Sequence, residues 1–481
     1  MKPVKLVDSA FLHIETPTTP MHVGALFVLA APTRARKTFF EDFRRLIGAR
    51  LGASEVFTRR PAGLPWDLVN PMWVTAGNVD LEHHVRRHQL PEPGGQRELH
   101  DCVARLHESL LDRNRPLWEL HVIEGLAGGG RAIYAKTHHA GLDGHSAQLF
   151  LRAFVDESPR TARRHPVAPR PRADASRLAD LIWAGAAHQA SEVLRLPGHL
   201  AELATAAKAA LRDSRQGKPR AAGGSAPVPR APFNVVISGR RSFAGAELEL
   251  AAVKAAARQH AATINDVVLA TVAGAVRRWL VGREALPTAP LHAGVPVSSR
   301  TPGDNEHAIQ VAFIAVNLHT DEPLPARRLA AIHASAHDAK QAVATFKLLV
   351  PEDAPSVGLP WIIQGLGRLL RFPQVADRVP LPFNLIVSNV PGPPLPFYIA
   401  GARVLTYYPV SIPFHGNALN ISVYSYDGRL FFGLTACPDA LPDVAALAEG
   451  IPREFAALAR PVRRVAARAK PGKSAQRRRK A

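Results

Sequence analysis

Cysteine is scarce in this chain. Only Cys102 and Cys437 occur among its 481 residues, far apart and without partners at metal-ligand spacing. A disulfide framework or a structural zinc site needs several cysteines or histidines at short, regular spacings. We therefore expect neither a disulfide framework nor a bound metal. Such low cysteine usage is typical of a protein of the reducing cytoplasm.

Long hydrophobic runs are also missing. The longest apolar stretches, such as residues 23–31 and 267–276, fall short of the roughly 20 residues that span a bilayer. Near the N-terminus, Asp8, His13 and Glu15 interrupt the apolar segment that a signal peptide would need. We expect a cytoplasmic protein that is not integral to a membrane.

Acidic residues are too few to balance the basic ones. The formal net charge is +20, and residues 460–481 contain ten Lys or Arg and no Asp or Glu. A second basic stretch, residues 160–177, mixes arginine with proline. Basic tails bind anionic partners, but this tail has no aromatic side chain that would stack on bases, so we expect no specific nucleic acid partner. Peripheral contact with acidic lipid headgroups is one open alternative, and a solvated tail that keeps the protein soluble is the other.

Length and composition predict two globular domains. A chain of 481 residues, 47% of them hydrophobic, is too long for one ordinary domain and has enough apolar material for two cores. Strand and helix patterns alternate in both halves, which predicts the α/β class. We expect an N-terminal domain at residues 1–155, a crossover with amphipathic helices at 156–232, a C-terminal domain at 233–459 and a disordered basic tail at 460–481.

The most informative motif is the heptapeptide HHAGLDG at residues 138–144. Residues 131–137 alternate as a strand does, and apolar residues recur at helical spacing after the motif. The motif therefore lies on a strand-to-helix turn, where an imidazole can project into a cleft and transfer protons near neutral pH. In the structural alternative, Asp143 caps the following helix and Gly144 gives the turn room.

Two further segments have structural explanations of their own. Thr263 and Asp266 have capping-box spacing at the start of a predicted helix, so capping is the structural role of Asp266. The Pro-Leu-Trp segment at 116–118 leads into a predicted strand; packing is the stronger explanation there, and lining a substrate channel is the alternative. Residues 420–435, with Asp-Gly at the centre, form the clearest predicted hairpin.

Several ordered motifs together carry a resemblance to a known family. Besides the histidine motif they are FLH at 11–13, ETPTTPMHVG at 15–24, RPLWE at 115–119, TINDVVL at 263–269, VPVSSR at 295–300, SNVPGP at 388–393 and GARV at 401–404. They resemble the bacterial wax ester synthase/acyl-CoA:diacylglycerol acyltransferase family over nearly the whole chain except the crossover and the tail. The resemblance implies an α/β fold of two chloramphenicol-acetyltransferase-like domains, as in peptide-condensation enzymes, with an active-site tunnel between them.

The resemblance also implies the reaction, which moves a fatty acyl group from acyl-CoA to diacylglycerol or to a long-chain alcohol. This transfer needs a base for the hydroxyl, stabilisation of the tetrahedral oxyanion and a proton for the departing thiolate. One histidine can act as base and then as acid, and by resemblance that residue is His139. Because no Gly-x-Ser-x-Gly segment occurs, direct transfer is favoured over an acyl-enzyme intermediate.

The other candidate residues receive supporting roles. His138 supports the turn, since successive strand residues point to opposite faces. Asp143 orients the turn, with Arg300 as a candidate partner, and Gly144 permits a tight approach. Asn265 either has a functional role, as a donor to the oxyanion or a brace of the histidine loop, or simply supports the helix terminus, two evenly matched alternatives. The remaining candidates are Asp266, beside Asn265, and Pro116, Leu117 and Trp118 along a substrate channel.

The implied partners are acyl-CoA, as co-substrate, and diacylglycerol or a fatty alcohol, with peripheral contact to an anionic membrane or lipid droplet and no bound cofactor. One segment departs from the family pattern: after Arg300 the chain continues through Gly303-Asp304-Asn305-Glu306, which bears on acceptor preference more than on catalysis. The alternatives are an enzyme of the same fold, such as a condensation enzyme, with another acceptor, and a non-enzymatic lipid-binding protein.

Overall fold

The computed structural model describes most of both predicted domains. The described residues are 2–31, 38–63, 70–142, 144–159, 228–298, 311–346, 359–376 and 378–460, with isolated positions between 183 and 190. The predicted crossover helices and the basic tail beyond Arg460 lie outside the described residues, as do Asp143 and Arg300.

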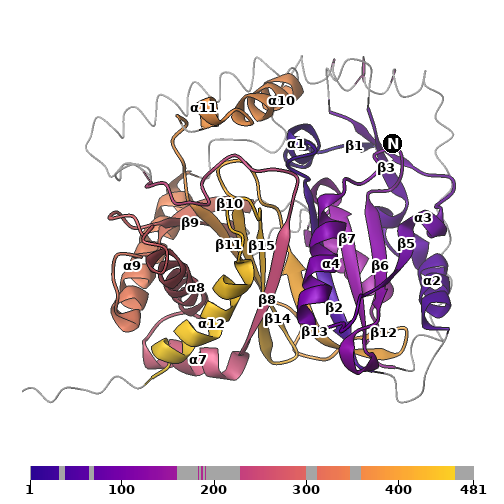
Figure 1. Cartoon of the computed structure of the whole chain (residues 1–481). Coiled ribbons are helices and arrows are strands. Elements are labelled where there is room, and N and C mark those ends of the chain that lie inside the picture. Colours follow the sequence, from indigo (N-terminus) through magenta and orange to yellow (C-terminus); the bar gives the residue numbers. More distant parts are fainter. Residues whose placement is uncertain are drawn as a thin grey trace, which may run out of the picture.

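The first half is built on a six-stranded sheet (Figure 1). Its strands, in spatial order, are β12 (Tyr398–Ile399), β13 (Ala402–Val410), β2 (His22–Leu29), β7 (Arg131–His138), β6 (Trp118–Glu124) and β5 (Val85–Gln89). The predicted pair of strands before the histidine motif is confirmed, because β6 and β7 are antiparallel neighbours. The turn between them contains Gly128 and Gly129, whose φ angles of +79° and +74° favour glycine.

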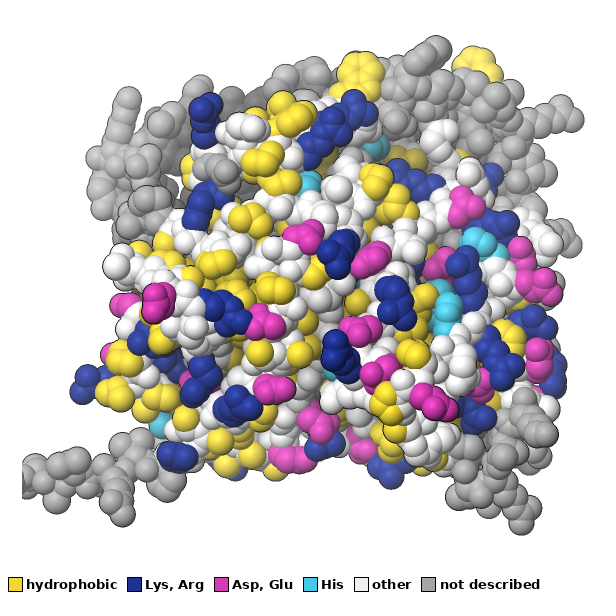
Figure 2. Space-filling view, viewed as in Figure 1, with side chains coloured by type: hydrophobic (Ala, Val, Ile, Leu, Met, Phe, Trp, Pro, Cys, Tyr) yellow, Lys and Arg dark blue, Asp and Glu magenta, His cyan; other side chains and the backbone are white. Residues whose placement is uncertain are grey.

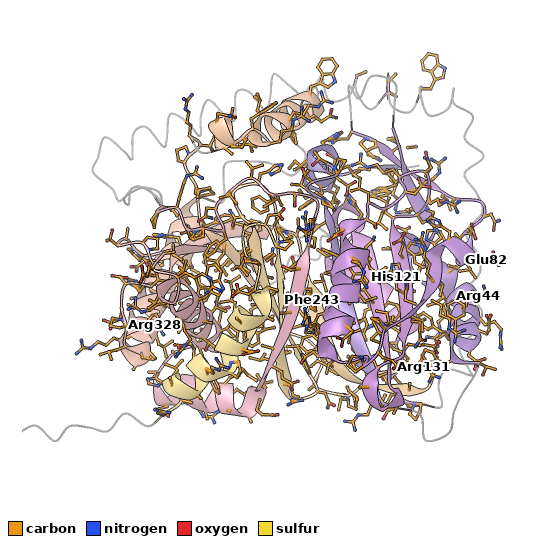
Figure 3. All side chains as sticks on the ribbon, viewed as in Figure 1. Arg44, Glu82, His121, Arg131, Phe243 and Arg328 are labelled. Atoms are coloured by element: carbon orange, nitrogen blue, oxygen red, sulfur yellow. The ribbon has the colours of Figure 1, made fainter. Side chains whose placement is uncertain are left out.

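Helices cover both faces of the first sheet. Helix α4 (Gln96–Glu108) lies between this sheet and β8 (Ser242–Glu249) of the second sheet (Figure 1). There the ring of His100 contacts the ring of Phe243, which Figure 3 labels, edge to face, with ring centroids 5.1 Å apart. An aromatic cluster, in which Phe150 and Phe154 contact each other, joins α5 (Gly144–Phe154) to the core. Helix α2 (Phe39–Arg50) packs against α5. A small sheet of β1 (Lys2–Pro3), β4 (Met72–Thr75) and β3 (Arg59–Ala62) and the short helix α3 (Leu81–His84) complete this half.

The second half repeats the plan with another six-stranded sheet. Its strands, in spatial order, are β10 (Val311–Asn317), β9 (His292–Ser298), β11 (Leu385–Val390), β14 (Leu419–Tyr426), β15 (Arg429–Ala436) and β8. The predicted hairpin is confirmed: β14 and β15 pair antiparallel around Asp427 and Gly428, whose φ angles are both positive. Helix α8 (Ile264–Val281) is buried along most of its length because α7 (Leu250–Gln259), α9 (Pro325–Phe346) and α12 (Val444–Leu458) pack against it.

One segment of the second half belongs to the first sheet. Strand β13 pairs with β2 antiparallel, although residues 402–410 fall inside the predicted C-terminal domain. Tyr407 of β13 stacks on Tyr424 of β14 with ring centroids 4.0 Å apart, so the two sheets share an aromatic interface. The predicted domain boundaries stay a prediction, but this strand shows that the chain of one half completes the sheet of the other.

Candidate active site

The two adjacent histidines lie where β7 ends. His138 is the last residue of the strand, and His139 opens a short 3-10 helix, His139–Gly141. The His138 amide donates to the Leu117 carbonyl at 3.0 Å, and the His139 amide donates to the Met21 carbonyl at 2.9 Å. The backbone of the turn is therefore held from two sides, by the Pro-Leu-Trp segment and by the loop that precedes β2.

The His138 ring is buried and faces a carboxylate. Its Nδ1 accepts a hydrogen bond from the Ala140 amide at 3.1 Å. Because Nδ1 is an acceptor, the neutral ring carries its proton on Nε2. Nε2 lies 3.2 Å from Oε1 of Glu15, a distance typical of an ion pair, although the two groups are not aligned as a hydrogen bond. Both ring nitrogens of His138 thus face protein groups, the Ala140 amide and the Glu15 carboxylate, which fits a supporting role.

Glu15, at the end of α1 (Leu6–Ile14), is a residue that the sequence interpretation missed as part of the site. Its Oε1 accepts from the Met21 amide at 3.0 Å, and its Oε2 accepts from Nη2 of Arg113 at 2.8 Å. Burial raises the pKa of this carboxyl, but His138, Arg113 and the Met21 amide outweigh burial and lower the pKa to about 2. The available signal was that Glu15 is the first residue of the ETPTTPMHVG segment, two residues after FLH.

The His139 ring stacks on Phe11 of α1. The ring centroids are 4.0 Å apart with an interplanar angle of 17°. Nδ1 is buried and has no aligned hydrogen-bond partner among the described residues. Burial lowers the pKa of His139 to about 4, and the neighbouring His138 acts in the same direction. The imidazole is therefore neutral at pH 7, which is the form that a general base requires.

The Pro-Leu-Trp segment packs beneath the turn. Leu117 belongs to a small buried cluster with Leu12 and Ala140. Trp118 is fully buried; its Nε1 donates to the Phe57 carbonyl at 3.2 Å, and its ring stacks on His84 at 4.2 Å. Pro116 is buried as well. The surroundings of these three residues are those of packing and backbone support.

The candidate residues of the second half lie at the start of α8. The capping box is present: the Asp266 amide donates to Oγ1 of Thr263 at 3.2 Å, and the Thr263 amide donates to the Asp266 carboxylate at 2.9 Å. The same carboxylate accepts from Nδ1 of His333 at 2.7 Å. Burial raises the Asp266 pKa, but these partners outweigh it and the pKa is lowered. Asp266 therefore caps the helix, as the structural alternative predicted.

Asn265 links two motifs that are distant in sequence. Its Oδ1 accepts a hydrogen bond of 3.4 Å from Nδ2 of Asn389, which belongs to the SNVPGP segment in β11. Within the described part of the chain, Asn265 makes no hydrogen bond to either histidine. The structure thus brings together His138, His139 and the Leu117 backbone, and separately joins Asn265 to Asn389.

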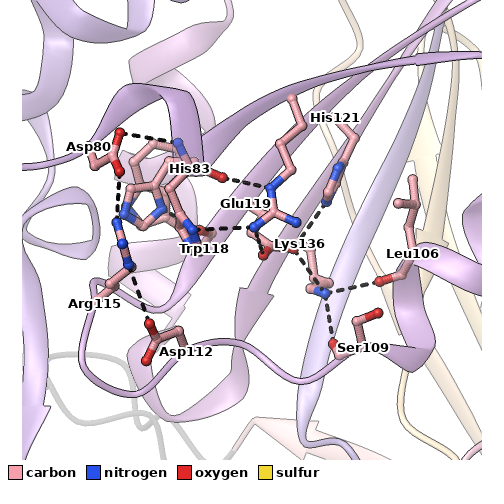
Figure 4. Close-up of polar contacts among 12 residues, drawn as sticks. Asp80, His83, Leu106, Ser109, Asp112, Arg115, Trp118, Glu119, His121 and Lys136 are labelled. Atoms are coloured by element: carbon pink, nitrogen blue, oxygen red, sulfur yellow. Dashed lines mark hydrogen bonds and ion pairs between the residues drawn. The ribbon is translucent and has the colours of Figure 1, made fainter.

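A buried ionic cluster lies behind the turn, and the sequence interpretation missed it. Glu119 and Lys136 are directly opposite on β6 and β7, with 3.1 Å between Nζ and Oε2. The same carboxylate contacts His121 at 3.2 Å and Arg86 at 3.1 Å (Figure 4). Lys136 also donates to the carbonyls of Leu106 and Ser109 at 2.9 and 2.8 Å, which ties β7 to the end of α4.

The pKa values of Glu119 and Lys136 explain how these two buried side chains can remain charged. Burial raises the pKa of Glu119, yet His121 and Lys136 outweigh it and lower the value to about 2. Burial lowers the pKa of Lys136, and Glu119 opposes that change. Each buried charge is thereby compensated by a partner, as a charge in a protein interior must be. The cluster anchors β7 two residues before His138.

A cavity of about 370 Å³ lies beside α1. Its lining includes Leu12, His13, Arg60, Arg113 and Gln364, but neither His138 nor His139. The predicted tunnel between the domains stays a prediction. Across the described ranges, no three His, Cys, Asp or Glu side chains are grouped so that they would hold a metal ion.

Comparisons with known proteins place the motifs in context. Residues 4–268 match the wax ester synthase/diacylglycerol acyltransferase catalytic domain, and residues 310–459 match the WS/DGAT C-terminal domain. A putative diacylglycerol O-acyltransferase of Mycobacterium tuberculosis is 37% identical over 448 residues, covering 91% of this chain and 95% of the relative. A second, probable diacylglycerol O-acyltransferase of the same organism is 36% identical over 449 residues, covering 92% and 95%.

Comparison with solved structures leads to the same family. The wax ester synthase/diacylglycerol acyltransferase from Marinobacter aquaeolei VT8 superposes with a TM-score of 0.67 at 31% identity, covering 95% of this chain and 98% of that one. The first condensation domain of the calcium-dependent antibiotic synthetase has a TM-score of 0.54 at 15% identity, covering 96% and 97%, a likeness of fold alone. The predicted α/β class and its relation to condensation enzymes are confirmed.

Proposed function

Because the chain belongs to the wax ester synthase/diacylglycerol acyltransferase family, we propose that it transfers a fatty acyl group from acyl-CoA to the hydroxyl of a diacylglycerol or a long-chain alcohol, with His139 as the general base. The observation that carries the assignment to His139 is its geometry: the residue follows the end of β7 in the histidine motif, its ring stacks on Phe11, and its backbone is held on the Met21 carbonyl. Burial, which lowers the pKa of the ring, is consistent with the neutral form that a base requires.

The proposed reaction uses one proton twice. Since Nδ1 is buried, Nε2 is the nitrogen that takes the proton from the acceptor hydroxyl. The alkoxide oxygen attacks the thioester carbonyl, and the tetrahedral oxyanion collapses with cleavage of the carbon–sulfur bond. The imidazolium returns its proton to the departing thiolate of CoA. The low pKa of His139 makes the imidazolium a strong acid, which suits this last step.

Glu15 and His138 act in this proposal as positioning residues. The backbone of Met21 connects Glu15 to the base, because the Met21 amide donates to Glu15 and the Met21 carbonyl accepts from the His139 amide. Arg113 keeps the carboxylate in place. A shift of Glu15 would therefore move the backbone of His139 and the ring of His138 together.

The remaining candidates keep roles that suit their surroundings. Asp143 and Gly144 orient the turn, as the resemblance implies, although Asp143 lies outside the described residues. Asn265 braces the start of α8 through Asn389, and Asp266 caps that helix. Pro116, Leu117 and Trp118 support the turn by packing rather than by lining a channel.

The proposed acceptors reside in bilayers or lipid droplets, so the enzyme must visit a lipid surface. No described helix is long and apolar enough to span a membrane. Residues 460–481 supply ten basic side chains for a peripheral, salt-sensitive contact with an anionic surface. Deletion of these residues should weaken binding to anionic vesicles at low salt; equal binding by the full and shortened chains would rule out the tail as an anchor.

The deciding experiment gives the full-length protein radiolabelled palmitoyl-CoA with a diacylglycerol and a long-chain alcohol in competition. We expect labelled ester and free CoA in equal amounts, and the ratio of the two esters measures the acceptor preference. Hydrolysis of palmitoyl-CoA without ester, or no release of CoA at all, would contradict the proposal. A protein that only binds lipid would give the second result.

A further inference from the structure

Helix α10 (Leu359–Leu370) carries apolar side chains that the described protein leaves exposed. Trp361, Leu369 and Phe372, in the turn after the helix, are 52%, 53% and 47% exposed. A spacing of eight residues places Trp361 and Leu369 on one side of the helix, and Phe372 follows in the turn after it. Gln364 lies toward the protein, because its Nε2 contacts Nδ1 of His13 in α1 at 3.2 Å. The helix thus packs on α1 and presents an apolar stripe outward.

Basic residues accompany this stripe. Arg368 and Arg371 are exposed, and the guanidinium of Arg371 lies 5.1 Å from the centre of the Phe372 ring. Residues 359–376 contain no Asp or Glu. In the space-filling view, yellow and dark blue side chains gather at the upper edge where α10 lies (Figures 1 and 2). Large apolar side chains with arginines between them, and no acidic side chain, match an anionic lipid interface.

The position of α10 relates this stripe to the chemistry. Helix α1, on which α10 packs, carries Phe11, which stacks on His139. Leu12, His13 and Gln364 line the same cavity of about 370 Å³, so α1 and α10 both contribute to its wall, together with residues of β3 and the loops nearby. A lipid surface in contact with α10 is therefore next to the helix that holds the catalytic ring.

We propose that α10 docks the protein on an anionic lipid surface. Leu369 and Phe372 enter the acyl-chain boundary while Arg368 and Arg371 bind headgroup phosphates, and the acceptor passes from that surface along α1. This inference deepens the proposed function, on which the passage of the acceptor rests; the docking itself is independent of the reaction. It also differs from anchoring by residues 460–481, because it requires apolar insertion as well as charge.

The test compares two double variants in full-length protein and in protein lacking residues 460–481. The docking variant is Leu369→Glu with Phe372→Glu. The control is Val281→Glu with Leu324→Glu, at the end of α8 and before α9, where the side chains are 51% and 50% exposed. Both variants add the same charge at sites of equal exposure. Near-UV circular dichroism and the unfolding temperature verify that both are folded.

Flotation with phosphatidylcholine vesicles containing about 30% phosphatidylglycerol measures docking. Without residues 460–481, the docking variant should lose at least about tenfold in vesicle partitioning, and the control should stay within about twofold of its parent. In protein lacking residues 460–481, Arg368→Gln with Arg371→Gln should remove the preference for anionic over neutral vesicles. Unchanged binding of the docking variant, equal losses in both Glu variants, or an unchanged lipid preference of the Arg variant would overturn the proposal.

Activity separates this proposal from the proposed function. Transfer from palmitoyl-CoA to a short-chain alcohol dispersed in water should be equal in the docking variant and its parent. Transfer to diacylglycerol in anionic vesicles should fall in parallel with binding. If no variant transfers acyl groups to any acceptor, the proposed function fails while the flotation result still decides the docking. If vesicle activity persists after binding is lost, the passage of the acceptor from the docked surface is overturned.

Discussion

The two six-stranded sheets differ in what they bury. Both are covered by helices, but one face of the first sheet holds His22, Glu119, His121, Lys136 and His138. The corresponding interior of the second sheet is apolar, with Ile421 and Val423 of β14 facing Leu434 and Phe432 of β15. Titratable groups beneath a sheet are costly unless each has a partner. Their concentration in the first sheet agrees with the proposal that His139, in this half, is the general base.

The second half pairs its buried charges for another purpose. Glu454 of α12 contacts Arg328 of α9 at 3.2 Å and Arg278 of α8 at 2.5 Å, an arrangement that ties three helices together (Figure 3 labels Arg328 and His121). The network of the first half instead ties β6 and β7 to α4, immediately before the histidines. Buried ion pairs thus join helices in the second half, whereas in the first half they fix the strands that precede the histidine turn, the proposed site of the reaction.

The largest effect on activity is expected at His139, the proposed base in the first half. His139→Ala should reduce kcat/KM for acyl transfer by about 10²–10⁴-fold, because it removes the general base without disturbing the backbone bonds of the turn. His138→Ala should retain more activity, since that ring supports the turn rather than the proton transfer. Steady-state kinetics with palmitoyl-CoA measure both. Similar activity in His139→Ala and the parent would refute the mechanism.

The ionic clusters of the two halves should differ in their effect on stability. Lys136→Met removes a buried partner of Glu119 and should lower the free energy of unfolding by about 3–5 kcal/mol. Arg278→Met is the matched change in the second half; because Arg278 is 56% exposed and Glu454 keeps Arg328, it should cost less than about 1 kcal/mol. Denaturant unfolding measures both values. Equal losses in the free energy of unfolding would mean that the two clusters contribute equally to stability.

Glu15→Gln tests the positioning of the turn. The amide oxygen can still accept from Met21, but the pairing with Arg113 and His138 is lost, so kcat should fall about 10–100-fold with little change in KM. Glu247→Gln, at a partly exposed carboxylate paired with Arg429 in the second sheet, is the control and should leave both parameters unchanged. An unchanged kcat for Glu15→Gln, or a rise confined to KM, would remove Glu15 from the positioning role.

The pH dependence of kcat/KM tests whether the buried His139 of the first half is the base. His139 is neutral above its pKa of about 4, so kcat/KM should be level between about pH 6 and 8 and should fall tenfold for each pH unit below about 4. The readout is the initial rate with a dispersed alcohol after a rapid pH change. An inflection near pH 6.5 would show that the base is an ordinary, exposed imidazole.

Stability limits the acid end of that profile. His121 and His139 have folded pKa values of about 4, below the 6.5 of an unperturbed imidazole, so the unfolded chain binds protons first on acidification. Stability is therefore full above about pH 6.5 and is lost as pH falls toward 4. Circular dichroism at each pH separates this loss from protonation of the base.

The smallest effect is expected at Asn265. If its side chain braces α8 through Asn389, Asn265→Ala should reduce kcat less than about tenfold. An oxyanion donor would instead cost about 10²–10³-fold. Asn389→Ala is the matched variant and should give a similar, non-additive loss. A large loss in Asn265→Ala alone would show that the second half also takes part in the reaction.

Local patterns predicted much of this molecule. The strand and turn around His138, the capping box of Thr263 and Asp266, and the hairpin at Asp427 depend on neighbours within a few residues, and the structure has all of them. Hydrogen-bond spacing and turn geometry are short-range properties, so a single sequence reveals them.

The contacts that could not be predicted from the sequence depend on residues that are not local neighbours in the chain. The contact of Glu15 with His138 and the return of β13 to β2 join segments whose separation leaves no periodic trace. The pairing of Lys136 with Glu119 joins two neighbouring strands that were predicted, but it depends on a register that the sequence did not reveal. The sequence by itself determined the family, the α/β class and the identity of the histidine turn. Only the tertiary structure decided which carboxylate faces His138 and which ring covers His139, because burial and charge compensation are settled by the packing of distant segments.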